Sequence, residues 1–95
     1  MELEEFKNEI KEGVVLVDFY ATWCGPCQMQ SPIIDEFAKK HKEVKVLKLD
    51  VDLNEEIAKE YGVMSIPNIF VFKNGNMTYS KPGVHNLDSL EILTK

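Results

Sequence analysis

Residues 14–27 read Val-Val-Leu-Val-Asp-Phe-Tyr-Ala-Thr-Trp-Cys-Gly-Pro-Cys and combine an apolar strand pattern with two closely spaced cysteines. Its first seven residues are apolar on both faces except Asp18, a pattern typical of a central strand in a parallel sheet. Cys24 and Cys27 follow after a short loop, and Pro26 between them suits the first turn of a helix. The stretch therefore predicts a strand that leads into a helix, with two thiols at the junction.

The segments around this stretch alternate between helix and strand patterns. Apolar residues recur at helical spacing after it, for example Met29, Ile33 and Phe37. Asn74-Gly75 favours a tight hairpin between two strand patterns. The patterns predict helices at residues 3–10, 24–42, 54–61 and 86–93, the last two capped by Asn54 and Asn86, and strands at residues 14–20, 45–51, 68–73 and 77–80.

The order of these elements fixes the type of sheet. A strand, a helix and a strand in succession require a parallel pair with a right-handed crossover, whereas the final hairpin is antiparallel. A chain of 95 residues has the usual size of one domain and can bury one core. We therefore predict a single domain, residues 1–95, with an α/β fold in which a mixed four-stranded sheet carries helices on both faces.

Composition and charge exclude several classes of function. The net charge is -5, and all 11 basic residues are lysines, so clustered basic charge for nucleic acid is lacking. The longest apolar run, residues 14–17, is far too short to span a bilayer. The N-terminal segment Met1–Glu5 is acidic, unlike a secretory or organelle-targeting peptide. We expect a monomeric cytoplasmic protein that binds neither nucleic acid nor membrane.

The two cysteines are the first candidates for chemistry. Thiols at this spacing can form a small disulfide ring across one helical turn, and the partial positive charge of a helix N-terminus favours a thiolate. Cys24, at the helix start, is predicted to be the exposed nucleophile, and Cys27, one turn later, the more buried resolving thiol. The alternatives are two inert buried thiols, or a zinc site.

A zinc site needs about four ligands. Only His41 and His85 could complete the set, and neither has the spacing of a zinc finger. His41 is interpreted as ending a helix, where its cationic form suits the dipole, and His85 as a loop residue without a catalytic role. We therefore predict no metal site.

Asp18 interrupts the most apolar strand of the chain. An isolated buried carboxylate is costly, and desolvation raises its pKa. Two interpretations remain open: a structural aspartate bonded to backbone, or a proton acceptor poised near neutral pH. A nearby lysine would lower the pKa, and we expect desolvation to outweigh it.

The chain resembles the thioredoxin family over essentially its whole length. The residues that carry the match are 17–27, Pro32, 61–63, 65–67, 72–75 and Gly83. A bare Cys-x-x-Cys would be a weak signal, but Trp-Cys-Gly-Pro-Cys with a downstream Ile-Pro is highly specific. The resemblance implies a thioredoxin-like three-layer sandwich, a cis Pro67 beside a Cys24–Cys27 disulfide, and a buried Asp18 beneath Cys27.

The resemblance also implies further site residues. Lys48 falls at the family's position near the buried carboxylate, although its pattern alone predicts a solvated strand residue. The family's substrate-docking surface falls on Trp23, Gly25, Pro26, Ile66, Pro67, Gly83 and Val84.

The chain departs from the family pattern in several places. The edge strand that usually precedes the first helix is missing or reduced. The positions commonly occupied by Trp, Lys, Thr and Ala hold Tyr20, Gln28, Asn68 and Val84. These changes leave the redox centre intact and bear on which reductase and substrates fit.

The function implied is thiol–disulfide exchange that reduces disulfides in other proteins. No Gly-rich phosphate loop is present, so we expect no bound cofactor beyond the redox-active disulfide. Electrons would come from a separate reductase, a flavoenzyme that draws on NADPH. Two alternatives remain: an oxidase or isomerase that uses the same site, and a binding subunit retained for its docking surface.

Overall fold

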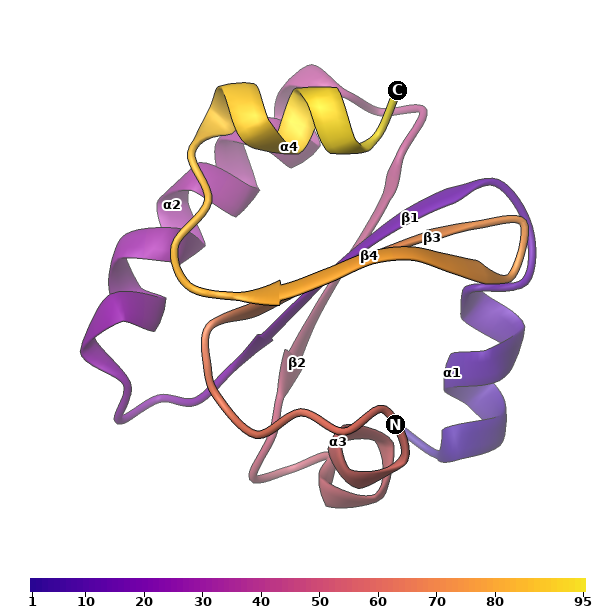
Figure 1. Ribbon diagram of the computed structural model, residues 1–95, viewed down its shortest axis with the longest axis vertical. Helices are drawn as coiled ribbons and strands as arrows, with labels where there is room; N and C mark the ends of the chain where they lie inside the picture. The colour runs from indigo at the N-terminus through magenta and orange to yellow at the C-terminus, as the bar shows by residue number, and fades with distance from the viewer.

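The computed structural model describes residues 1–95 as a four-stranded sheet with helices on both sides (Figure 1). The elements in chain order are α1 (Leu3–Glu9), β1 (Val14–Tyr20), α2 (Gly25–Lys40), β2 (Lys45–Asp50), α3 (Glu55–Glu60), β3 (Asn68–Lys73), β4 (Asn76–Pro82) and α4 (Leu87–Leu93). All eight predicted elements are present, and the predicted α/β architecture is confirmed.

The strand order is β2-β1-β3-β4. β1 runs parallel to β2 and antiparallel to β3, and β3 pairs antiparallel with β4, so the sheet is mixed as predicted. In this register Asp18 lies between Lys48 on β2 and Ile69 on β3. No helix combines the length and the apolar character needed to cross a membrane.

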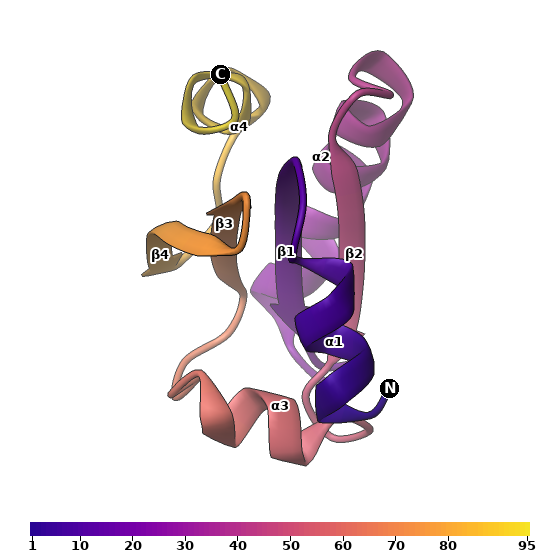
Figure 2. The same ribbon diagram turned by 90° about the vertical axis from the view of Figure 1, so that its right-hand side faces the viewer.

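Two apolar cores lie on opposite faces of the sheet (Figures 1 and 2). Because side chains alternate along a strand, Val15, Val17 and Phe19 of β1 pack with α1 and α3, while Leu16 packs with α2 and α4. Asp18 shares the face of Leu16. It therefore lies on the side of the sheet covered by α2, the helix that carries Cys27.

Most differences from the predicted elements lie at their ends. α2 ends at Lys40, and β4 spans residues 76–82, longer than the predicted 77–80. The cap predicted for Asn86 is confirmed, because its side chain accepts from Ser89 N at 2.8 Å. Asn54 occupies the N-cap of α3 as predicted, but its side chain makes no capping bond: its Nδ2 donates to Asp50 O and its Oδ1 accepts from the N-terminal ammonium.

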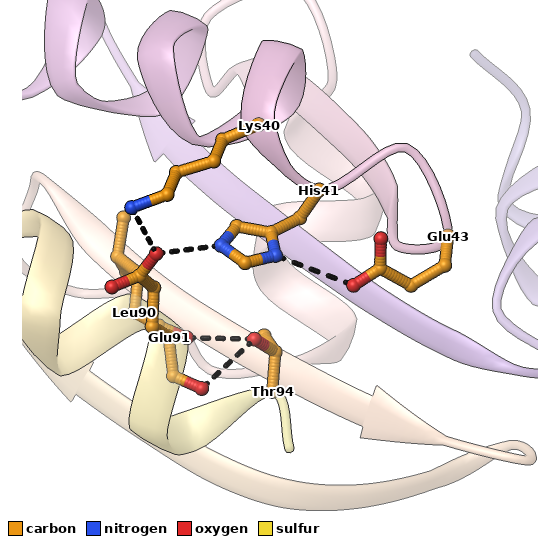
Figure 3. A network of polar contacts seen from close by, with 6 residues as sticks. All are labelled: Lys40, His41, Glu43, Leu90, Glu91 and Thr94. Atoms are coloured by element: carbon orange, nitrogen blue, oxygen red, sulfur yellow. Dashed lines mark hydrogen bonds and ion pairs between the residues drawn. The ribbon is translucent and has the colours of Figure 1, made fainter.

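The C-terminal ends of α2 and α4 meet in a network of charged groups (Figure 3). His41 ends α2, as predicted, and its Nε2 lies 2.6 Å from Glu91 Oε2. Lys40 Nζ reaches the same oxygen at 3.0 Å. The hydrogen bond to Glu91 raises the pKa of His41, and the same bond lowers the pKa of Glu91. The network therefore joins two helices that pack on the same face of the sheet.

Candidate active site

The two cysteines lie at the N-terminus of α2. The chain turns after β1, Cys24 N donates to Ala21 O at 3.2 Å, and Cys24 then occupies the N-cap of the helix. Pro26 fits the first turn of the helix, because N–H groups at that position have no backbone acceptor and proline lacks the N–H. The sulfurs of Cys24 and Cys27 are joined in a disulfide, with 5.2 Å between the Cα atoms.

The position of Cys24 favours a negative sulfur. Its Sγ accepts from Cys27 N at 3.2 Å, one of the N–H groups that a helix start leaves without a backbone partner. The helix dipole acts in the same direction. The exposed position predicted for Cys24 is wrong, however: Cys24 is 6% exposed and Cys27 3%. The two thiols are therefore distinguished by their places in the helix more than by accessible area.

A second segment approaches the disulfide from the start of β3. The Ile66–Pro67 peptide bond is cis, as the resemblance implied. Cys24 Sγ lies 3.8 Å from Ile66 O, and the Ile66 side chain packs against the small cluster of Ala21, Cys24 and Cys27. The carbonyl before the cis bond therefore borders the sulfur of Cys24.

A third segment, the turn after β4, closes this end of the molecule. Gly83 N donates to Pro67 O at 2.8 Å, so the turn is joined to the cis-proline segment. Gly83 has a φ of +105°, a backbone conformation that favours glycine. Val84 beside it is 44% exposed.

The residues of the predicted docking surface differ in accessibility. Trp23, Gly25, Pro26, Gly83 and Val84 are exposed, Ile66 is half-buried, and Pro67 is buried. Trp23 is 70% exposed, and its Nε1 donates to Asp52 Oδ2 at 2.8 Å, which fixes the ring beside the active-site turn. An apolar surface is thus available around a buried disulfide.

Asp18 is 1% exposed, and its Oδ1 has no hydrogen-bond partner. Burial raises the pKa of Asp18 from 3.8 to about 6, the positive charge of Lys48 lowers it by less, and Asp35 adds a smaller upward effect. The prediction that desolvation outweighs the lysine is confirmed. A carboxyl with this pKa changes its charge just below neutral pH, which suits a proton acceptor.

Lys48 makes no hydrogen bond to Asp18. Its Nζ donates to Ser31 Oγ at 2.7 Å and to Asp35 Oδ1 at 3.0 Å, both on α2. Its ammonium therefore acts on Asp18 only through its charge, although the two residues are opposite each other in the register of β1 and β2. The solvated position that the pattern suggested for Lys48 is confirmed, although its ammonium is held against α2.

Three of the residues at which the chain departs from the family pattern lie near the site, two beside Cys27 and one after the cis-proline. Tyr20 and Gln28 line a depression of about 220 Å³ beside Cys27. Asn68 is buried directly after the cis-proline, and its Oδ1 has no partner. The structure contains no cluster of three or more His, Cys, Asp or Glu residues that could hold a metal ion.

Gln30 was not among the predicted site residues, and it pairs with His85, which was predicted only as a loop residue. Gln30 on α2 is fully buried and bonds to the backbone of His85, which follows Val84 and is itself buried. The expected apolar face of α2 included Met29, but Met29 is 65% exposed and Gln30 takes the inward position. Gln30 lies three residues after Cys27, and this helical spacing predicts that both share the buried face of α2. The inward position was not predicted because glutamine is polar.

Comparison with known proteins identifies the family. The family model described as thioredoxin matches residues 1–95. A thioredoxin of Rickettsia felis is 52% identical over 88 residues, which are 90% of this chain and 84% of that protein. A thioredoxin of Bacillus subtilis is 43% identical over 91 residues, covering 95% and 88% of the two chains.

Solved structures agree with the sequence relatives. The crystal structure of oxidised mitochondrial thioredoxin 3 from Saccharomyces cerevisiae superimposes with a TM-score of 0.88, at 38% identity over 97% of this chain and 87% of that one. A thioredoxin of Fasciola hepatica gives a TM-score of 0.85 at 38% identity, covering 97% and 88%. Because fold, disulfide and sequence agree along the whole chain, this protein belongs to the thioredoxin family of thiol–disulfide oxidoreductases.

Proposed function

We propose that the protein reduces disulfides of other proteins in two steps, with Cys24 as the nucleophile. In the reduced protein the thiolate of Cys24 attacks one sulfur of a substrate disulfide. A bond forms between Cys24 Sγ and that sulfur, and the other substrate sulfur leaves as a thiolate. The observation that carries this assignment is the hydrogen bond from Cys27 N to Cys24 Sγ at the helix start, because it stabilises negative charge on that sulfur.

In the second step Cys27 resolves the mixed disulfide. Its thiol loses a proton to Asp18, and the resulting thiolate attacks Cys24 Sγ. The Cys24–Cys27 disulfide forms, and the second substrate sulfur leaves as a thiolate, so the substrate has gained two electrons and the protein has lost two. Asp18 suits this role because its pKa of about 6 leaves it largely ionised at neutral pH while still able to take a proton.

Lys48 serves this step indirectly. Its charge opposes the effect of burial on the pKa of Asp18, and Ser31 and Asp35 hold its ammonium on α2. We therefore assign it an electrostatic role toward Asp18, with no direct contact to the sulfurs.

The substrate binds across the surface formed by Trp23, Gly25, Pro26, Ile66, Pro67, Gly83 and Val84. An extended peptide could pair with the backbone near Ile66, and the exposed Trp23 and Val84 offer apolar contact on either side. This mode of binding places a substrate disulfide against Cys24 without a deep pocket.

The oxidised protein must then be reduced again. A thioredoxin reductase, a flavoenzyme that carries electrons from NADPH, is the partner we propose, and a monomer in the cytoplasm is the form in which we expect the protein to act. The chain itself needs no bound cofactor for the exchange, because both electrons are carried by its two sulfurs.

Insulin reduction coupled to NADPH and a panel of thioredoxin reductases tests this function. We expect turnover by the wild-type protein and none by Cys24→Ser. No turnover with any reductase, although dithiothreitol reduces the protein, would favour a binding subunit. Net oxidation of reduced substrates in a glutathione buffer would favour an oxidase or isomerase.

A further inference from the structure

Gln30 of α2 forms a polar clasp with the turn that follows β4. Its Nε2 donates to His85 O at 2.9 Å, and its Oε1 accepts from His85 N at 2.6 Å. The side-chain amide thus satisfies both backbone groups of one residue, as a neighbouring strand would. Gln30 is 0% exposed, so burying its side-chain amide costs free energy. The two bonds to His85 offset that cost, and they are the only hydrogen bonds of this amide.

The ring of His85 holds the same turn from its other side. Its Nδ1 lies 2.8 Å from Gly83 O, and its Nε2 lies 2.7 Å from Tyr79 Oη. A carbonyl can only accept, so Nδ1 carries the hydrogen, and in the neutral ring Nε2 accepts from the tyrosine hydroxyl. The ring therefore joins Gly83 to strand β4, and His85 as a whole is only 9% exposed.

The clasp and the disulfide share one helix. Gln30 lies three residues after Cys27, so both side chains project from neighbouring positions on the buried face of α2. Gly83, between the clasp and the cis-proline, donates to Pro67 O. The exposed Val84 is thus held between residues that are anchored to α2, β4 and Pro67.

We propose that Gln30 and His85 are positioning residues for protein substrates, which fix the Gly83–Val84 turn relative to Cys24. This inference rests on the proposed function, because it assumes that substrates bind beside that turn. A turn that is already ordered loses less conformational entropy when a peptide binds it. The clasp should therefore matter for large substrates that contact the turn, and should not matter for small disulfides that reach only the sulfur.

The test compares two substrates with three variants. Gln30→Met keeps the length of the side chain and removes both bonds of the clasp. His85→Phe keeps the clasp and the edge-on contact with Tyr79 but removes the ring bonds. Tyr79→Phe removes one hydroxyl only and is the variant least able to disturb folding. Ile57→Val removes one buried methylene group from α3, on the opposite face of the sheet. It is the control for a loss of stability that leaves the Gly83–Val84 turn unchanged.

Insulin serves as the protein substrate and 5,5′-dithiobis(2-nitrobenzoate) as the small disulfide. For Gln30→Met we expect kcat/KM for insulin to fall about 5- to 10-fold, mostly through KM, while the rate with the small disulfide changes less than about twofold. His85→Phe should behave similarly, and Tyr79→Phe should show a smaller loss of the same kind. Ile57→Val should leave both rates unchanged.

Amide hydrogen exchange gives an independent measurement. The amides of Gly83 and His85 should exchange at least about tenfold faster in Gln30→Met, while those of β1 keep their protection. Equal losses with both substrates, or unchanged insulin kinetics in all three variants, would overturn the inference. Failure of the wild-type protein to reduce either substrate would instead refute the proposed function.

Discussion

Replacing Asp18 with asparagine should stabilise the oxidised protein at neutral pH. Asparagine has nearly the same shape and carries no charge to desolvate. The pKa of Asp18 in the folded protein is about 6, against an ordinary value of 3.8. One pKa unit corresponds to about 1.4 kcal/mol. Ionisation of Asp18 above pH 6 therefore lowers the free energy of unfolding by about 3 kcal/mol. In a domain of this size, that difference corresponds to more than about 10 °C in melting temperature.

The sign follows from the direction of the pKa shift. Because the folded pKa is raised, the folded state binds more protons than the unfolded chain between pH 3.8 and about 6, and wild-type stability falls as pH rises through that window. The gain from Asp18→Asn should therefore be full above pH 7 and should shrink by about 3 kcal/mol toward pH 3. Urea unfolding of both oxidised proteins at several pH values measures it.

Asp88→Asn is the matched control, since Asp88 is exposed on α4 and the chemical change is the same. Because Asp88 lies in the first turn of α4, where a carboxylate suits the helix dipole, its replacement should alter stability by less than about 1 kcal/mol at every pH. A difference between wild type and Asp18→Asn that stays constant from pH 3 to 7.5 would refute the reasoning, because it would mean that Asp18 titrates with an ordinary pKa. Single-turnover reduction of a substrate should be slower in Asp18→Asn; an equal rate would remove Asp18 from the proton transfer.

Three further outcomes follow from the same geometry. In the reduced native protein, brief iodoacetamide treatment at neutral pH should label Cys24, because its sulfur accepts the helix amide; mass mapping that finds the label mainly on Cys27 would reverse the two roles. Cys27→Ser should trap adducts with proteins of a cell extract that vanish with dithiothreitol on a gel, and adducts no more abundant than with Cys24→Ser would argue against two-step exchange. The raised pKa of His41 and the lowered pKa of Glu91 make their contact most stabilising between their ordinary values of 4.5 and 6.5. The loss of melting temperature in Glu91→Gln should be greatest there, and a loss independent of pH would contradict this.

The sheet could be predicted from the sequence because each of its strands has a strong local pattern. The apolar run of β1 and the Asn74-Gly75 turn are both signals within a few residues, and the mixed topology follows from their order. The missing side-chain bond of the Asn54 cap could not be predicted, because the Oδ1 of Asn54 accepts instead from the N-terminus, which is 53 residues away. Distant partners of this kind leave no local pattern.

Some features of the site could be predicted from the sequence, and others could not. The disulfide and the raised pKa of Asp18 follow from a helix start and a buried strand. The contacts of Lys48 could not be predicted in this way, because a lysine opposite Asp18 in the register could equally have bonded to Asp18. Only the packing of α2 brings Ser31 and Asp35 within reach of its ammonium. The near-equal burial of the two cysteines was missed for a similar reason, since the residues that cover Cys24 come from the segment at Ile66.

The outer strand β2 has a consequence for behaviour at high concentration. It ends the sheet, so one edge of its backbone is open to another chain, and Val46, Leu47 and Leu49 would make it an attractive template. Lys45 precedes that apolar run and Lys48 interrupts it, and their side chains reach opposite sides of the sheet, toward Glu9 of α1 and Asp35 of α2. Two copies that joined along this edge would bring lysines close to one another, so the lysines disfavour growth into ordered aggregates.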